Sequence, residues 1–102
     1  MTLEQFRNAT TAPADLPPAL RALWHDARGD WDEAHRIAQD DEDTSGAWVH
    51  AYLHRKEGDL PNAAYWYRQA RQPAATGPLD AEWERIARAL LATSRRAEQR
   101  DS

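Results

Sequence analysis

The sequence predicts an all-helical protein made of two similar antiparallel helix-turn-helix hairpins and a C-terminal helix. A shift of 29 residues superimposes residues 20–37 on residues 49–66, with five identical positions. Each copy has a Gly-Asp pair at its centre, and the chain lacks the alternation of apolar and polar residues that is typical of strands. These observations indicate that one helical hairpin has been duplicated.

The Gly-Asp pairs at positions 29–30 and 58–59 predict the turn of each hairpin. Glycine adopts the left-handed backbone conformation that ends many helices, and an aspartate side chain caps the helix that follows. Glu33, three residues after Asp30, completes a predicted capping box, and Pro61 fits the first turn of a helix, where its missing N–H costs little. We therefore expect positive φ angles at Gly29 and Gly58.

Capping and turn residues place the helices in order along the chain. Asp15 precedes Leu16 and two prolines and starts the first main helix in the same way. The predicted main helices span residues 16–28, 31–41, 46–57, 60–71 and 80–96. Residues 2–8 can add a short N-terminal helix. The resulting division is an N-terminal arm, a single helical domain and a tail, at residues 1–15, 16–98 and 99–102.

Apolar residues at helical spacing predict which faces are buried. The C-terminal helix carries a clean stripe, formed by Trp83, Ile86, Ala87, Leu90 and Leu91. The inner stripe of helix 60–71 consists of Leu60, Ala63, Ala64, Tyr67 and Ala70. Trp66 lies on the flank of that stripe and is expected to cover the C-terminal helix, whereas Tyr65 lies nearly opposite the stripe and is expected to be exposed.

The second hairpin resembles a tetratricopeptide-type repeat. The resemblance rests on Gly58 and Asp59, on Ala63 five residues after the glycine, and on Tyr67 and Ala70 beyond it. It implies a right-handed stack of hairpins that holds a peptide or protein, closed by a capping helix. The spacing is 29 residues where the family has 34, and there are only two units.

The family register and the helical periodicity disagree about the buried face of helix 46–57. When the second hairpin is aligned with the tetratricopeptide-type repeat, the residues that point inward are Ala47, His50, Ala51 and His54. Periodicity instead selects Trp48, Val49, Tyr52 and Leu53. The first copy carries a matching arc, formed by Leu20, Leu23 and Trp24. Because both copies agree, we take the periodic arc as the buried face.

Composition excludes several classes of function. The net charge of −4 argues against a protein that binds the phosphate backbone of nucleic acids. The chain has no cysteine, which excludes disulfides and thiolate metal sites, and it has no apolar run long enough for a signal peptide or a membrane span. We expect a cytoplasmic protein that binds neither nucleic acid nor membrane.

Possible chemistry centres on histidines and carboxylates. His50 and His54 are four residues apart and Glu57 follows three later, so all three can project from one helical face as metal ligands; His25 repeats the position of His54. Helix capping accounts for the carboxylates near the first turn, Asp26, Asp30, Asp32 and Glu33. No phosphate loop or nucleophile motif is present, so no catalytic residue is assigned and no cofactor is expected.

Two functions follow from this sequence. The preferred one is a non-catalytic module that binds a protein partner, or a second copy of itself, through Tyr65 and Trp66, since aromatic residues concentrate interface energy. The alternative is a small metal-dependent or acid–base enzyme that uses His25, His50, His54 and the turn carboxylates.

Overall fold

Glycine and aspartate set the hairpin turns in this computed structural model, which describes residues 1–100, with side chains up to residue 94. Gly29 and Gly58 have φ angles of +80° and +91°, which confirms the expected left-handed turns. The side chains of Asp30 and Asp59 each accept a backbone N–H of the next helix. Glu33 does not complete the expected capping box, because its carboxylate pairs with Arg36.

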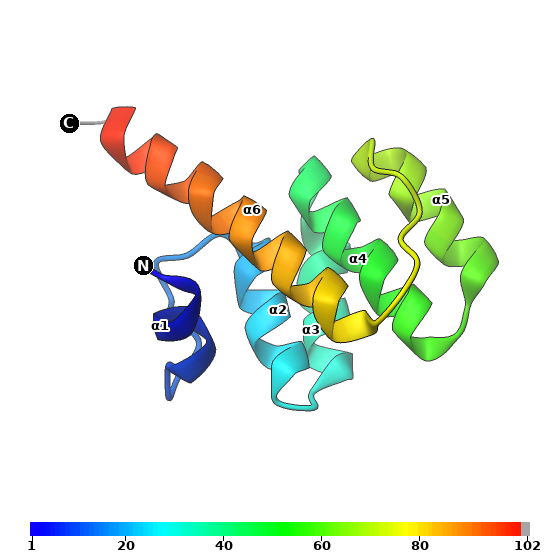
Figure 1. Ribbon diagram of the computed structural model, residues 1–102, viewed down its shortest axis with the longest axis horizontal. Helices are drawn as coiled ribbons and strands as arrows, with labels where there is room; N and C mark the ends of the chain where they lie inside the picture. Colours follow the sequence, from blue (N-terminus) through cyan, green and yellow to red (C-terminus); the bar gives the residue numbers. More distant parts are fainter. Residues whose placement is uncertain (101–102) are drawn as a thin grey trace.

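Six helices form the described part of the chain (Figure 1). They are α1 (Leu3–Asn8), α2 (Pro18–Ala27), α3 (Trp31–Asp40), α4 (Thr44–Glu57), α5 (Leu60–Ala70) and α6 (Leu79–Arg100). Helix α2 begins after Pro17 without a side-chain cap, so the expected role of Asp15 is wrong. Residues 99 and 100 of the predicted tail belong to α6, and residues 101–102 lie outside the described residues.

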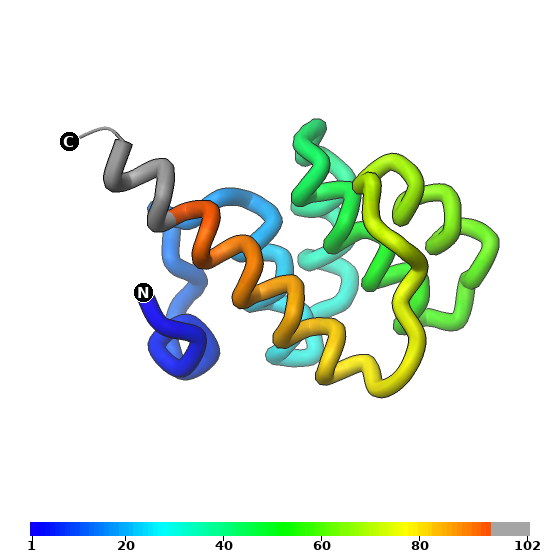
Figure 2. The backbone as a smooth tube through the Cα atoms, turned by 45° about the horizontal axis from the view of Figure 1, so that its top comes forward, coloured from blue at the N-terminus to red at the C-terminus, as the bar shows by residue number. Residues whose placement is uncertain are grey.

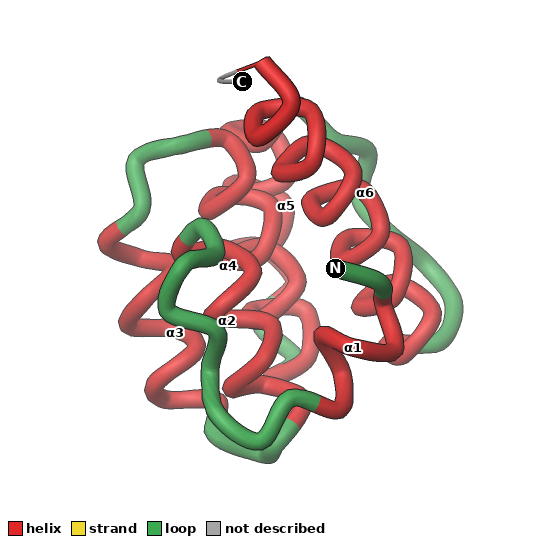
Figure 3. The backbone as a smooth tube through the Cα atoms, turned by 90° about the vertical axis from the view of Figure 1, so that its left-hand side faces the viewer, coloured by secondary structure: helices red, strands yellow, loops and turns green. Residues whose placement is uncertain are grey.

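The four middle helices form two hairpins that lie side by side, and α6 crosses them (Figures 1 and 2). Helix α2 packs against α3 and α4 packs against α5, while α3 and α4 join the hairpins. Helix α6 packs on α1, α2 and α4. Figure 3 shows only helices and loops in the described chain, as the sequence predicts. None of these helices combines the length and apolar character needed to cross a membrane.

Helix α4 is covered on almost every side, because it packs against α2, α3, α5 and α6. Val49, Tyr52 and Leu53 of the periodic arc are buried, but so are the residues that the family register turns inward, Ala47, His50, Ala51 and His54. Trp48 is only half-buried. The periodic arc is buried as predicted except at Trp48, but the exclusion of the opposite arc was wrong, because both faces of α4 are inside the protein.

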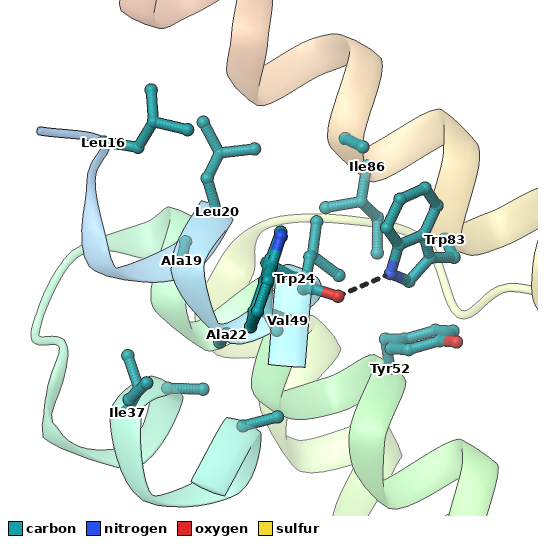
Figure 4. Packing of buried hydrophobic residues seen from close by; sticks show 14 of the residues in the cluster. Leu16, Ala19, Leu20, Ala22, Trp24, Ile37, Val49, Tyr52, Trp83 and Ile86 are labelled. Atoms are coloured by element: carbon teal, nitrogen blue, oxygen red, sulfur yellow. Dashed lines mark hydrogen bonds between the residues drawn. The ribbon is translucent and has the colours of Figure 1, made fainter. Parts of the chain in front are cut away.

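The main core lies between α2, α3, α4 and α6 and also receives α1 (Figure 4). The indole of Trp83 on α6 donates its N–H to the carbonyl of Leu23, at 3.0 Å, and stacks on Phe6 of α1, with ring centroids 5.9 Å apart. Phe6 is fully buried, so the short N-terminal helix contributes to the core. Trp83 therefore connects α6 to both α1 and α2.

Helix α5 departs from the predicted packing at two residues. Leu60 was expected on the inner stripe but is 64% exposed. Trp66 was expected to cover α6, yet it stacks on His50 of α4 and packs in a small second cluster with Ala51 and Ala63. Among the described helices, α5 packs closely only on α4, and Tyr67 reaches α6 through a hydrogen bond to Glu82. The Trp66 prediction was wrong because α6 packs on α1, α2 and α4 and not on the face of α5 that carries Trp66.

Candidate metal centre

Three histidines from α3 and α4 meet between the two hairpins. His50 and His54 project from the same side of α4 because they lie four residues apart. His35 approaches from α3, and one side-chain nitrogen of each histidine lies within 4.8 Å of those of the other two. The Nε2 atoms of His35 and His50 are 3.1 Å apart. We call His35, His50 and His54 the three-histidine cluster.

Two tryptophans flank the cluster and limit how its rings can turn. The indole of Trp31 stacks on His35 with ring centroids 4.8 Å apart, and that of Trp66 stacks on His50 at 4.1 Å. The Trp31 ring also donates its N–H to the carbonyl of Leu53 on α4, at 3.0 Å. This bond holds the start of α3 against α4, so His35 faces the other two rings.

Burial keeps the inner imidazole uncharged. His50 is only 4% exposed, and this burial, with the nearby His54 and His35, lowers its pKa to about 4. Burial also lowers the pKa of His35, and the charge of His54 acts in the same direction. At neutral pH both rings therefore offer a nitrogen lone pair. The Nδ1 atom of His50 is buried and has no hydrogen-bond partner within the described residues.

The spacing of the rings suits a transition-metal ion. Zinc–nitrogen bonds of about 2.0 to 2.1 Å in tetrahedral geometry put two ligand nitrogens about 3.3 Å apart. The separation of 3.1 Å between the Nε2 atoms of His35 and His50 is close to that value. Small side-chain movements would bring the third nitrogen, now within 4.8 Å, to the same distance. Neutral imidazoles are common ligands of zinc, copper and nickel.

Glu57 and Asp59 lie next to the cluster at the second hairpin turn. The Oε1 atom of Glu57 is 2.6 Å from Nδ1 of His54. His54, Glu57 and Asp59 also bring one ligand atom each within 4.8 Å of one another. Both carboxylates are exposed, and Asp59 already caps α5 by accepting the N–H of Asn62. Of these two, Glu57 is the residue that acts directly on a cluster histidine.

Sequence reasoning found part of this cluster. His50 and His54 lie together in the cluster, and Glu57 lies beside His54, but the three predicted ligands do not form one group within the described residues. Both histidines are buried. His35 was missed, because the 29-residue shift aligns it with Ala64 and so gives it no counterpart. His25 packs edge-on against Trp24 and contributes no atom to the cluster.

The carboxylates assigned to capping have different roles. Asp30 caps α3 as expected. Asp26 does not cap the turn: it is 3% exposed and accepts hydrogen bonds from Tyr52, at 3.1 Å, and from Lys56, at 2.9 Å. The ion pair between buried Asp26 and exposed Lys56 ties α2 to α4, so Asp26 joins the two hairpins.

The exposed face of α5 contains the residues expected to bind a partner. Tyr65 is 45% exposed, as predicted, and its ring lies edge-on to that of Trp66. Trp66 is half-buried and covers His50. The exposed large apolar side chains of α5 are thus Tyr65 and Leu60, while Trp66 packs mainly on the histidine cluster.

Comparison with protein-family models, with curated proteins and with solved structures found no match to this chain.

Proposed function

We propose that this protein binds a divalent transition-metal ion through His35, His50 and His54. The observation that carries the proposal is the convergence of three imidazole nitrogens, within 4.8 Å of one another, at the boundary of the two hairpins. Two of the rings have lowered pKa values and are neutral at physiological pH, which is the form that binds metals.

The burial of the cluster supports a ligand over simple core packing. A buried polar atom without a partner costs about 1 to 3 kcal/mol, and Nδ1 of His50 is such an atom. Apolar side chains would fill the same space without that cost. A metal held by Nε2 of His35 and Nε2 of His50 would replace the contact of 3.1 Å between these two atoms and would leave Nδ1 of His50 to another partner.

Zinc is the ion that the donor set fits best. It accepts three imidazoles in tetrahedral geometry and leaves a fourth position for water or another ligand. Cobalt(II) occupies similar sites and gives visible absorption bands whose intensity reports a tetrahedral environment. Nickel and copper, which accept the same donors, are the competing ions.

Calorimetric titration of the untagged protein with zinc at pH 7.5 tests the proposal. The absorption of bound cobalt(II) provides an independent measurement. We expect one site per chain that is lost in His35→Gln. His25→Gln is the matched control, because His25 lies outside the cluster, and it should bind as the wild type does. A wild-type protein that takes up no metal, or equal losses in both variants, would rule the site out.

A second function is favoured by the open face of α5. We propose that the two hairpins form a tetratricopeptide-like, right-handed stack that binds a second copy of the chain. Two hairpin repeats are fewer than the roughly three repeats that are usually needed to bury a continuous core. Among the described helices, α5 packs closely only on α4. A second copy would bring the same exposed Leu60 and Tyr65.

Analytical ultracentrifugation over a range of protein concentrations tests this second proposal. We expect the wild type to dimerise and Tyr65→Ser to shift toward monomer without a change in its melting temperature. Arg88→Ala, an exposed change on α6, is the control and should leave the equilibrium unchanged. A wild type that stays monomeric at every concentration would refute self-association.

A further inference from the structure

Glu57 occupies a position that helix formation alone does not explain. It is the last residue of α4, where a negative charge meets the negative end of the helix dipole and is unfavourable. Its side chain turns back to His54, with Oε1 at 2.6 Å from Nδ1. A carboxylate at that distance receives a strong hydrogen bond from the imidazole N–H.

That hydrogen bond decides which nitrogen of His54 is available. When Nδ1 carries the proton and donates it to Glu57, Nε2 keeps its lone pair. Histidines that bind metals commonly donate their other N–H to a carboxylate, which orients the ring and makes it a stronger ligand. The side chain of His54 is 9% exposed and that of Glu57 is 39% exposed, so the carboxylate reaches a buried ring from the surface.

We infer that Glu57 is a positioning residue of the three-histidine cluster: it holds His54 in the Nδ1–H form so that Nε2 is the ligand atom. This inference rests on the proposed metal binding. It assigns Glu57 to the outer shell of the site, whereas the sequence suggested Glu57 as a ligand itself. Asp59 is a poorer candidate for this role, since its carboxylate already accepts the N–H of Asn62.

The first test measures the tautomer of His54 in the metal-free protein by ¹⁵N NMR of the imidazole nitrogens. The wild type should show the Nδ1–H form at His54. Glu57→Gln, whose amide oxygen can still accept the hydrogen bond, should largely keep this form, and Glu57→Ala should lose it. A His54 tautomer that is the same in all three proteins would overturn the inference, even if metal binds.

The second test is zinc affinity of the same proteins at pH 7.5. Loss of an outer-shell carboxylate typically weakens metal binding 10- to 100-fold, so we expect Glu57→Ala to fall in that range and Glu57→Gln to fall between it and the wild type. Glu4→Ala, which removes an exposed carboxylate from α1, controls for the change in net charge. Equal affinities in wild type and Glu57→Ala would overturn the role of Glu57.

The two tests separate this inference from the function on which it rests. If the wild type binds no zinc, the metal proposal fails, and the tautomer measurement alone decides whether Glu57 orients His54. If the wild type binds zinc and Glu57→Ala abolishes binding altogether, Glu57 is a direct ligand, which contradicts the positioning role. A 10- to 100-fold loss together with a changed tautomer supports it.

Discussion

His50 should make the stability of the protein sensitive to mild acid. Its pKa is lowered from 6.5 to about 4 in the folded protein, chiefly by burial and then by His54 and His35. Above pH 6.5 the ring is neutral in both states and contributes nothing to the pH dependence. Between pH 6.5 and 4 the unfolded chain binds a proton that the folded chain does not, so the free energy of unfolding decreases as the pH falls.

The size of the effect follows from the pKa difference. Each pH unit in this window costs about 1.4 kcal/mol, so acidification from pH 7.5 to pH 5 should remove about 2 kcal/mol through His50 alone. For a domain of this size that corresponds to a fall of roughly 10 °C in the melting temperature. His35, whose pKa is lowered mainly by burial, adds to the loss in the same direction.

The assay is urea unfolding at pH 7.5 and pH 5, followed by tryptophan fluorescence in metal-free buffer. His50→Phe keeps an aromatic ring against Trp66 but cannot be protonated, and it should lose markedly less stability than the wild type over the same range. His25→Gln should follow the wild type. If the wild type and His50→Phe lose stability in parallel, a neutral buried His50 is the wrong explanation.

Three further predictions concern the fold and can be checked by chemical denaturation of each variant. Gly58→Ala should lose about 1 kcal/mol because of its positive φ alone, since an added Cβ meets no atom within 4 Å; unchanged stability would contradict the turn. Trp83→Ala should lose about 4 kcal/mol and Trp66→Ala only about 2, because Trp83 is buried and Trp66 is half-exposed. A larger loss in Trp66→Ala would indicate that Trp66, and not Trp83, holds α6 on the rest of the protein. Lys56→Met should lose about 2 kcal/mol, less than for a fully buried pair because the Lys56 side chain is 38% exposed and Asp26 keeps the hydrogen bond from Tyr52. Asp26→Ala should lose less, since only Lys56→Met leaves a buried carboxylate without its cation; equal losses would argue against this asymmetry.

Local signals made the hairpins predictable from the sequence. A left-handed glycine followed by a capping aspartate acts within a few residues, and both turns formed where Gly29 and Gly58 indicated. The burial of α4 was not predictable in this way. Periodicity assumes one covered face, whereas α4 packs against α3 and α5 as well as against α2 and α6, and that arrangement depends on how the hairpins pack.

In the candidate site, too, spacing along one helix could be read from the sequence, whereas the packing of one helix on another could not. His50 and His54 could be paired because their spacing on one helix fixes their direction. His35 could be joined to them only by knowing which side of α3 meets α4. One signal was available: His35 lies one turn after Trp31 on the side of α3 that also carries the buried Ala38. The role of Trp66 depended on the tilt of α6, which no local pattern encodes.

The boundary between the two hairpins has a consequence for how such a site arises. His35 belongs to the first copy of the duplicated unit, and His50 and His54 belong to the second, so neither copy alone contains the three-histidine cluster. If a duplication produced the two hairpins, as the repeat predicts, the junction between them had no counterpart in the parent hairpin. Ala64 is the position that matches His35, and among the described helices α5 packs closely only on α4, so a ring at Ala64 would have no further helix of this kind to meet. A chain extended by a third unit would gain a second such junction, and with it a place where the same chemistry could evolve again.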